Sequence, residues 1–320
     1  MDEQASAPRT RIVVVGSYMH AFVVRAPRLP NDGETVFGTD SEIGPGGKGS
    51  NQAIAAARLG ATVTILAWVG QDSFGDAARD LWEREGLAGG FVRRTADRPT
   101  GMAFIMVDGA GQNRIVVTPG ANDALGARDA DEAEDAIAGA QAVIAQFESP
   151  VAVVERALAL ARRHGVRTIL NPAPARVVPD SVLALADVIT PNESEIEALT
   201  GIAAAGQGRA RAAAALRARG PRAIVLTLGE DGAYLLDDAG GRHIPGVRVP
   251  VTDTTGAGDA FSGALAVALA RGASLDEAVG LANAAGAFCV TRRGVVPGLG
   301  READLRALRD AATAARGEMR

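Results

Sequence analysis

Residues 44–70 read GPGGKGSNQAIAAARLGATVTILAWVG, in which a glycine-rich turn leads into an alanine-rich helix and then into a strand. The strand candidate TVTILAWVG (62–70) is rich in β-branched residues and lacks the strict polar–apolar alternation of a half-exposed strand. Such runs are typical of parallel sheets that helices cover on both faces. This helix–strand unit therefore indicates an α/β fold.

Similar units recur along the chain. The strand candidates are residues 11–16, 62–70, 142–147, 167–171, 188–190 and 223–229. The helix candidates are Ser50–Leu59, Ser73–Glu85, Pro150–His164, Asn192–Leu199, Gly208–Ala218, Ala260–Arg271 and two further helices after Ala273. Because strands alternate with helices, the sequence predicts a central, mostly parallel sheet with helices on both faces. No linker-like segment divides this core, so we expect residues 1–320 to form a single domain.

Two segments interrupt the alternation. Phe22–Gly38 has two short extended pieces around a Pro/Asn/Asp/Gly turn, and Gly101–Thr118 has two apolar runs that flank DGAGQN, a strong hairpin signal. Neither has a helical partner. We expect the two hairpins to pair into a small protruding sheet that caps a site or contacts a second subunit. Ordinary surface hairpins remain the alternative.

The composition narrows the class of protein. The 320 residues carry a formal net charge of −5, and the 33 basic residues are dispersed, which argues against a nucleic-acid partner. The lone Cys289 excludes an intramolecular disulfide and suits a reducing cytosol. The first ten residues lack a signal-peptide pattern, and no apolar run reaches the roughly 20 residues of a membrane span. We therefore expect a cytoplasmic protein without a membrane partner.

The glycine-rich turn at 44–50 does not fit the phosphate-binding loop of nucleoside-triphosphate hydrolases. That loop reads G-x-x-x-x-G-K-[ST]. Here Gly49 follows Lys48, and Glu42 stands where the first glycine is required. The pattern fails at two positions, so these glycines need a different function.

A second glycine-rich turn offers a better phosphate site. Residues 253–270 read DTTGAGDAFSGALAVALA, a turn that leads into an apolar helix. Backbone N–H groups of Gly256, Ala257 and Gly258, together with the positive end of the helix, would form an anion hole for a phosphoryl group. Asp259 at its mouth would accept a proton from an attacking hydroxyl. The alternative is that Asp259 only caps the helix.

These motifs resemble the ribokinase/phosphofructokinase-B carbohydrate kinase family. GGKGSNQAIAAARLGA (46–61) is similar to the first signature of that family, and DTTGAGDAFSGAL (253–265) to the second. Further matches, in order, are TPGAN (118–122), QFESP (146–150), NPAPA (171–175), TPNESE (190–195) and TLGEDGAY (227–234). The resemblance covers about residues 11 to 310. It implies a ribokinase-like fold with lid segments at about 17–45 and 95–121, and a homodimer through the lid sheets.

The resemblance also implies the roles of individual residues. The turn at 46–51 would hold a sugar rather than a nucleotide, and Glu148 would add an acidic contact. ATP would lie along the segment 227–232, with Mg²⁺ arranged through water by the N-x-x-E motif, and a monovalent cation, normally K⁺, would lie beside the anion hole. The implied substrate-binding residues are Met19, Ala21, Gly46, Gly47, Lys48, Gly49, Ser50, Asn51, Glu148 and Asp259. The implied nucleotide-binding residues are Asn192, Thr227, Leu228, Gly229, Glu230, Asp231, Gly232, Gly258 and Asn283. The implied metal ligands are Glu195 for Mg²⁺ and Asp253, Thr255, Cys289, Arg292, Gly294 and Gly298 for the monovalent cation, with Gly298 replacing a serine that is frequent in the family.

One departure from the family pattern concerns the sugar. Ribokinases carry GS-x-N-x-D after the first strand, whereas this chain has Met19 in place of the Asn and Ala21 in place of the Asp. Ribose hydroxyls left unpaired in a buried site would cost about 1–3 kcal/mol each. Either Tyr18 or His20 supplies the contacts, or the substrate has a less polar edge or is a nucleoside.

The sequence therefore predicts an ATP-dependent kinase that phosphorylates a primary hydroxyl of a small sugar, with D-ribose to ribose 5-phosphate as the expected reaction. Asp259 would be the general base, and Gly256–Gly258 the anion hole. The alternatives are a keto-sugar, deoxy-ketogluconate, adenosine or pseudouridine kinase on the same scaffold. A binding protein without catalytic activity is the alternative from a different class.

Overall fold

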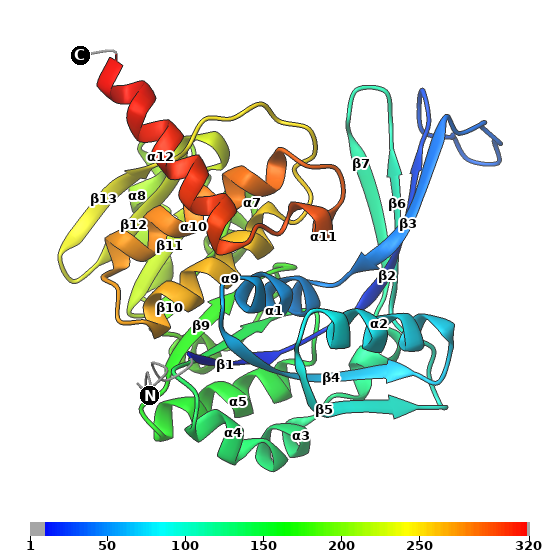
Figure 1. Ribbon diagram of the computed structural model, residues 1–320, viewed down its shortest axis with the longest axis horizontal. Helices are drawn as coiled ribbons and strands as arrows, with labels where there is room; N and C mark the ends of the chain where they lie inside the picture. The colour runs from blue at the N-terminus through cyan, green and yellow to red at the C-terminus, as the bar shows by residue number, and fades with distance from the viewer. Residues whose placement is uncertain (1–9, 319–320) are drawn as a thin grey trace, which may run out of the picture.

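The computed structural model describes residues 10–318, so the prediction about a signal peptide at the first ten residues lies almost wholly outside the described part. Within that part, nine strands form one sheet in the order β13-β12-β11-β10-β9-β8-β1-β4-β5 (Figure 1). The strands are β1 (Arg11–Val15), β4 (Thr62–Gly70), β5 (Ala88–Thr95), β8 (Ala142–Gln146), β9 (Arg167–Asn171), β10 (Val188–Ile189), β11 (Ala223–Thr227), β12 (Gly232–Asp237) and β13 (Gly240–Pro245). Neighbours from β11 to β5 pair in parallel, and β12 and β13 add an antiparallel hairpin at one edge. The predicted, mostly parallel sheet is confirmed.

Helices cover both faces of this sheet, as the apolar strands predicted. The helices are α1 (Lys48–Arg58), α2 (Ser73–Arg84), α3 (Ala127–Glu132), α4 (Glu134–Ala138), α5 (Val151–Arg163), α6 (Asp180–Leu183), α7 (Glu193–Thr200), α8 (Gly208–Arg217), α9 (Ala257–Ala270), α10 (Leu275–Val290), α11 (Val295–Gly298) and α12 (Glu302–Glu318). Residues of α1, α2, α9 and α10 form one core with the sheet, and residues of α3 to α8 form a second core on the opposite face. Alternate residues of β1 belong to different cores: Ile12 and Val14 to the first, Val13 and Val15 to the second.

Helices α1 and α9 pack unusually close together, and a glycine makes this possible. A Cβ added at Gly263 of α9 would lie 2.6 Å from the Cβ of Ala55 and 2.9 Å from the carbonyl oxygen of Gln52, both in α1. Only a residue without a side chain fits at such a distance. The first turns of the two helices, which carry the two glycine-rich motifs, are thereby brought side by side.

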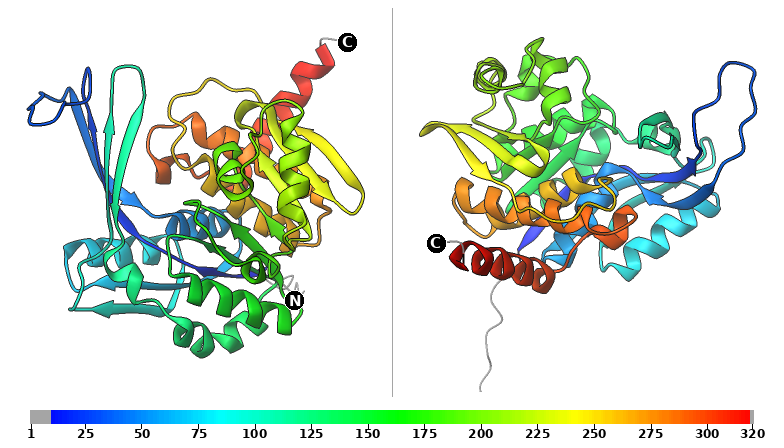
Figure 2. Two further views of the ribbon diagram at one scale, coloured as in Figure 1. Left: turned by 180° about the vertical axis from the view of Figure 1, so that it is seen from behind. Right: turned by 90° about the horizontal axis from the view of Figure 1, so that it is seen from above.

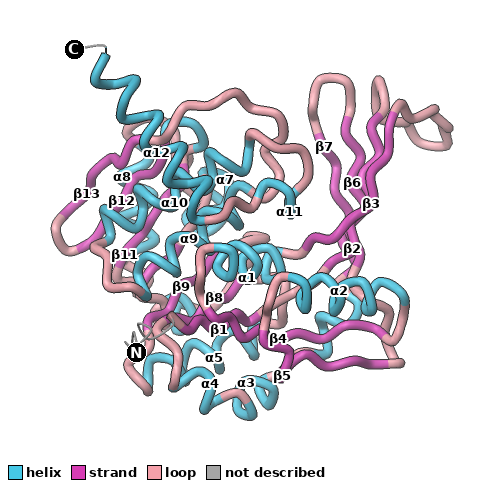
Figure 3. Tube along the Cα trace, in the orientation of Figure 1, coloured by secondary structure: helices cyan, strands magenta, loops and turns pink. Residues whose placement is uncertain are grey.

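A separate four-stranded sheet projects from the body (Figures 2 and 3). Its order is β3-β2-β6-β7, with β2 (Met19–Arg25), β3 (Asp40–Gly46), β6 (Met102–Val107) and β7 (Asn113–Thr118). The β6–β7 hairpin around residues 108–112 is as predicted. The first hairpin differs, because its return strand is β3 rather than a piece within Phe22–Gly38. Residues 26–39 form a long turn instead, and β3 runs directly into the turn at Gly46 and Gly47.

Several elements were missed by the sequence analysis. Strand β5 begins with Ala-Gly-Gly and pairs with β4 at the far edge of the sheet. The hairpin of β12 and β13 was not predicted. Over residues 10–318, no helix has the length and apolarity required to cross a membrane.

Candidate active site

The amino end of α9 has the geometry expected of an anion hole. Gly256 precedes the helix with φ +84°, a left-handed conformation that glycine adopts without strain. The first N–H groups of a helix have no intrahelical acceptor, and its amino end carries a partial positive charge. Asp259 is the third residue of the helix and accepts no capping bond from its own first turn, so the reading of Asp259 as a simple cap is wrong.

Asp259 is held instead by helix α1. Its side chain is 6% exposed. Its Oδ2 accepts a hydrogen bond from Asn51 Nδ2 (2.8 Å), and its Oδ1 accepts one from Gln52 Nε2 (3.1 Å). Asn51 also has a buried Oδ1 for which no hydrogen-bond donor is found. The close packing of α1 and α9 therefore brings the Asp259 carboxylate of the second signature into hydrogen-bond contact with the Asn51 and Gln52 amides of the first signature.

The GGKG turn is shaped by close backbone contacts. Gly47 has φ +93°, and a Cβ there would lie 2.8 Å from the backbone of Tyr18 and Met19. A Cβ at Gly49 would lie 2.3 Å from Gly16. These glycines are needed so that the start of α1 can lie against the end of β1.

Three carboxylates surround Lys48. Burial would lower the pKa of Lys48, but Asp259, Glu148 and Glu195 together raise it above its ordinary value, so the ammonium is charged. Burial raises the pKa of Glu148, although Lys48 and a hydrogen bond from Ser17 act against this. Ser17 Oγ and the Lys48 backbone N donate to Glu148 Oε2 at 2.6 Å and 2.7 Å. Glu148 is therefore not a solvated strand-end carboxylate.

The N-x-x-E motif forms a helix cap. Asn192 Oδ1 accepts from the Glu195 backbone N at 2.8 Å, and Glu195 Oε2 accepts from the Asn192 backbone N at 2.9 Å, which together make a capping box at the start of α7. Burial raises the pKa of Glu195, and both Lys48 and Asp259 act on it electrostatically. Glu195 is half-buried, and its carboxylate lies within electrostatic reach of Lys48 and Asp259.

The rest of the predicted nucleotide segment follows β11. Asn192 forms an isolated parallel bridge with Thr227, and the Leu228 N–H donates to the carbonyl oxygen of Gly232 at 2.8 Å. Gly229, Glu230 and Asp231 form a 3₁₀ turn between β11 and β12, and Gly232 has φ +93°. Asn283 of α10 donates to the carbonyl oxygens of Ile244 and Pro245 at 3.2 and 3.1 Å. Its amide therefore anchors the end of β13 beside this segment.

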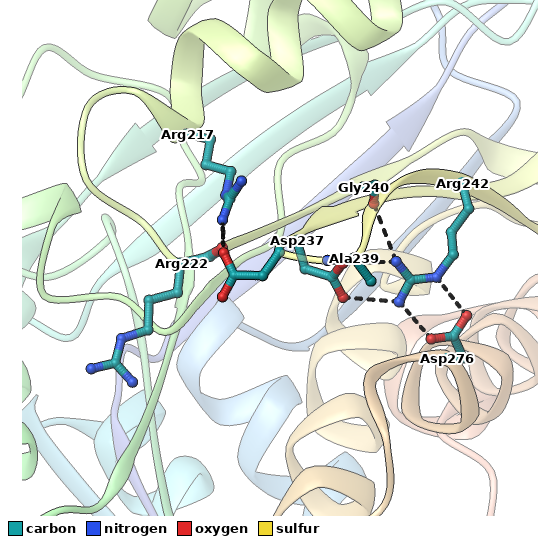
Figure 4. A network of polar contacts seen from close by, with 8 residues as sticks. Arg217, Arg222, Asp237, Ala239, Gly240, Arg242 and Asp276 are labelled. Atoms are coloured by element: carbon teal, nitrogen blue, oxygen red, sulfur yellow. Dashed lines mark hydrogen bonds and ion pairs between the residues drawn. The ribbon is translucent and has the colours of Figure 1, made fainter.

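An ionic network fixes the other end of the same hairpin (Figure 4). Arg242 of β13 binds Asp237 of β12 (2.8 Å) and Asp276 of α10 (2.7 Å). Arg217 of α8 pairs with Asp238 at the hairpin turn. The hairpin is thus tied by ion pairs to α8 and α10, helices on opposite faces of the sheet.

The predicted ligands of the monovalent cation lie together. Asp253 Oδ1 accepts from Thr255 N (2.9 Å), and Asp253 Oδ2 accepts from Gly294 N (3.1 Å). Burial alone would raise the pKa of Asp253, but these donors lower it, so the carboxylate is ionised. Cys289 Sγ donates to the Thr255 carbonyl oxygen (3.6 Å), and the Cys289 carbonyl oxygen accepts from Arg292 N (3.2 Å). An ionised carboxylate next to turn carbonyls is a donor set that fits a monovalent cation.

Tyr18 and His20, the candidates for the missing polar contacts, are both engaged by other side chains, and Tyr18 Oη lies 3.2 Å from His20 Nδ1. Tyr18 is 1% exposed and packs edge-on against Trp82. The His20 ring stacks on Phe74 of α2 at 4.2 Å, on the side of β2 opposite to Ala21. Ala21 instead lies beside the glycine turn, since a Cβ at Gly46 would come within 3.7 Å of its Cβ. Met19 is 4% exposed, so this part of the site is apolar.

Some site residues differ from the prediction or were missed. Ser50 Oγ accepts from the Trp82 indole at 2.8 Å, so its hydroxyl is engaged in the core. Ser17 contacts Glu148 and Gln52 contacts Asp259, but neither was singled out. Asn171 was also missed, and it contacts Gln52. The signal was available for Asn171, which ends a buried parallel strand. Polar residues at the carboxyl ends of such strands face the ligand site of α/β folds.

A mostly parallel α/β body with a separate lid sheet, and a buried carboxylate in the first turn of a helix that follows a glycine-rich turn, are typical of a small-molecule kinase of ribokinase-like fold. A family model described as pfkB family carbohydrate kinase matches residues 9–299, and the chain belongs to this family. It is an ATP-dependent carbohydrate kinase, as the sequence predicted.

Individual relatives are similar over most of the chain. Ribokinase of Mus musculus is 43% identical, with 92% of this chain and 91% of the relative covered. Ribokinase of Haemophilus influenzae is 39% identical (89% and 94%), and deoxyribokinase of Salmonella typhi is 36% identical (88% and 93%). The structure of Arabidopsis thaliana ribokinase complexed with ribose and ATP superposes with a TM-score of 0.87, at 30% identity over 94% of this chain and 99% of that one.

Proposed function

We propose that the chain transfers the γ-phosphate of ATP to the primary hydroxyl of a pentose. The observation that carries this proposal is the position of Asp259, buried between the amides of α1 and the amino end of α9. A carboxylate beside an anion site is unfavourable unless it accepts a proton as the phosphoryl group is transferred. Residues 1–320 would act as one domain, with the segments 17–45 and 95–121 as its lid.

In this mechanism Asp259 removes the hydroxyl proton as the oxygen attacks the γ-phosphorus. The N–H groups at Gly256, Ala257 and Gly258 hold the equatorial oxygens of the phosphoryl group while charge develops on them. Lys48 is charged and surrounded by carboxylates, and it orients the sugar. Lid closure would exclude water, which competes with the sugar as acceptor.

The unpartnered atom of Asn51 supports a sugar contact at the GGKG turn. A buried amide oxygen without a donor is unfavourable by about 1–3 kcal/mol. A sugar hydroxyl that donates to Asn51 Oδ1 would satisfy it. Glu148, held by Ser17 and Lys48, offers a second acceptor in the same space.

The acidic groups fit Mg²⁺–ATP. Lys48 with Asp259, Glu148 and Glu195 leaves an excess of negative charge that a divalent cation would balance. Among residues 10–318, no group of three or more Asp, Glu, His or Cys side chains is arranged to hold a metal ion by itself. Magnesium that keeps its waters and phosphate ligands needs only one carboxylate, and Glu195 would supply it through water. The bound metal would neutralise phosphate charge, and K⁺ beside Asp253 would support the anion hole.

The sugar specificity follows from Met19 and Ala21. Ribose is the acceptor expected from the resemblance, and ribokinases are among the relatives. The apolar surface of Met19 and Ala21 instead favours a pentose that lacks a hydroxyl on that edge, and a deoxyribokinase is 36% identical to this chain. We therefore propose 2-deoxyribose as a second acceptor.

A substrate panel decides between these acceptors. ADP release would be measured with ribose, 2-deoxyribose, fructose, 2-keto-3-deoxygluconate, adenosine and pseudouridine, each with and without K⁺. We expect kcat/KM for 2-deoxyribose to be at least equal to that for ribose. If only adenosine or pseudouridine were phosphorylated, the protein would be a nucleoside kinase. If ATP bound but no acceptor led to ADP release, the protein would be a binding protein without catalytic activity.

The role of Asp259 has its own test. We expect Asp259→Asn to lose about 10²- to 10⁴-fold in kcat because the amide cannot accept the proton. Sugar and ATP should still bind with dissociation constants near those of the wild type, measured by calorimetry. A variant within tenfold of wild-type kcat would remove Asp259 from the mechanism.

We also propose that the chain acts in the cytoplasm as a homodimer that contacts its partner through the lid sheets. It would use no nucleic acid or membrane partner. The exposed apolar side chains of the lid support the dimer.

A further inference from the structure

A chain of buried amides lies behind Asp259, on the side away from the turn at 46–49. Gln52 donates from Nε2 to Asp259 Oδ1 and to Asn171 Oδ1, both at 3.1 Å. Gln52 Oε1 accepts from Gln146 Nε2 at 2.7 Å. Gln52 and Gln146 are 0% exposed, and Asn171 is 7% exposed. None of these amides belongs to the proposed sugar or nucleotide contacts.

The fold brings these amides together from three elements. Gln146 and Asn171 end the neighbouring parallel strands β8 and β9, where they are direct register partners. Gln52 comes from α1, whose close packing at Gly263 sets it against the first turn of α9. We call these three residues, Gln52, Gln146 and Asn171, the amide relay. The relay connects the carboxyl ends of β8 and β9 to the carboxylate of Asp259, the proposed general base.

Each amide in the relay has only one permitted orientation. Asn171 Nδ2 donates to the main-chain carbonyl oxygen of Thr190 at 3.0 Å, and a carbonyl can only accept. Asn171 Oδ1 must then face Gln52, which requires the NH₂ group of Gln52 at that position. The second hydrogen of the same NH₂ group is directed at Asp259 Oδ1.

We propose that Gln52 is a positioning residue that fixes Asp259 Oδ1 as an acceptor, so that the proton of the sugar hydroxyl is transferred to Oδ2. This rests on the proposed role of Asp259. The Gln52 N–H cannot turn away and repels a proton on Oδ1, whereas the Asn51 amide that donates to Oδ2 has an oxygen without a partner and is not held in one orientation. The hydroxyl O–H bond breaks with its proton moving to Oδ2, and its electron pair forms the bond from the oxygen to the γ-phosphorus. The bond between the γ-phosphorus and the β–γ bridging oxygen breaks at the same time, and its electron pair leaves with ADP.

A purely structural role for the relay has different consequences. If the amides only satisfied a buried carboxylate, their loss would lower stability without changing the chemical step. If they orient the base, their loss lowers kcat with little change in KM. It also changes the pH dependence of kcat, because a donor to Asp259 Oδ1 is gone.

The test compares Gln52→Met, which keeps the length but removes the donor, with Gln52→Glu, which replaces the donor by an acceptor. For Gln52→Met we expect kcat to fall by about 10- to 100-fold, as for a misplaced reacting group. KM for sugar and ATP should stay within threefold, and the acid limb of kcat should move up by about one pH unit. Gln52→Glu should move that limb further, because two carboxylates in contact share a proton.

The matched control is Ser262→Ala, which removes a buried hydroxyl of α9 that contacts Thr190 (3.4 Å) but not Asp259. Its kcat and pH profile should match the wild type. If Gln52→Met fails to fold, Asn171→Leu frees the Gln52 amide to turn and should cause a smaller kcat loss with the same direction of pH shift. A folded Gln52→Met or Asn171→Leu with wild-type kcat and pH profile, or with its loss confined to KM, would overturn the proposal. An active Asp259→Asn would instead overturn the proposed function.

Discussion

Gly298 shows how one residue depends on its neighbour near the proposed cation site. The family frequently has serine here, which would add a hydroxyl ligand. A Cβ added at Gly298 would lie 2.8 Å from Cys289 Sγ and 2.9 Å from the Cys289 carbonyl oxygen. Burial raises the pKa of the Cys289 thiol to about 12, so the thiol is neutral and is no cation ligand itself. The thiol and the main chain of Cys289 together therefore exclude a side chain at position 298.

A double-mutant cycle tests this dependence. We expect Gly298→Ser to lower the free energy of unfolding by about 1–3 kcal/mol, the cost of overpacking a filled core. In the Cys289→Ala background the same change should cost less, with a positive coupling between the two positions in urea unfolding. Additive effects would show that the thiol does not exclude the serine.

At the same scale, the sequence identified residues by type but not by partner. Asp259, Asn51 and Lys48 belong to motifs whose chemistry is readable, and the structure brings all three together. Gln52 was not recognised, because its role depends on the contact between α1 and α9, and the glycine that permits this contact lies more than 200 positions away in the chain. The orientation of Ser50 toward Trp82 was unreadable for the same reason.

At the scale of elements, Asp72 joins helix α2 to the base of the lid. Its Oδ1 accepts from Gly75 N, which caps α2, and from Thr100 Oγ1 at 2.6 Å. Its Oδ2 accepts from Thr100 N at 2.8 Å, two residues before lid strand β6. Burial alone would raise the pKa of Asp72, but these donors lower it below its ordinary value.

This contact has a defined pH dependence. A carboxyl group whose pKa is lower in the folded state adds stability above its unfolded pKa, about 3.9, and this stability is lost as the pH falls through the folded pKa. We expect Asp72→Asn to lower the free energy of unfolding at pH 7 by about 1 kcal/mol. The difference from the wild type should shrink below about pH 4 in urea unfolding. Asp32→Asn, at an exposed lid turn, is the control, and a difference that is constant with pH would contradict this account.

Strands with continuous apolar runs were predictable from the sequence, whereas strands that depend on tertiary contacts were not. The buried strands β1, β4, β8, β9, β10 and β11 were found because their apolar runs indicate burial on both faces. The β12–β13 hairpin is held by hydrogen bonds from Arg242 to Asp276 and from Asn283 to the Ile244 carbonyl oxygen. Asp276 and Asn283 belong to α10, so the sequence of the hairpin alone does not reveal these contacts. Strand β3 was predicted at the wrong residues. Gly44, Pro45 and Gly46 resemble a turn in the sequence, although they pair with β2 in the structure.

At the scale of the whole molecule, the lid presents an apolar surface that the body does not cover. Ile43, Phe22, Phe104 and Val116 are direct partners across the four strands and therefore lie on one face. Phe22 is half-buried, whereas Ile43, Phe104 and Val116 are 63%, 44% and 59% exposed. Arg293 of the body pairs with Asp40 and Glu42 of β3, which tethers the lid at its polar edge. A contiguous apolar row of this kind is typical of a protein contact surface.

If a second copy covers this row, a charge placed in it should separate the subunits. We expect the wild type to sediment as a dimer at micromolar concentration and Val116→Glu to sediment as a monomer, because burying an unpaired carboxylate in an apolar interface is strongly unfavourable. Val177→Glu changes a valine that is 98% exposed outside the lid, and it should remain a dimer. Since the proposed mechanism closes the lid over the sugar, the Val116→Glu monomer should show a raised KM for sugar. A dimeric Val116→Glu, or a wild type that is monomeric at all concentrations, would exclude this face as the interface and leave the lid as a cover for its own subunit alone.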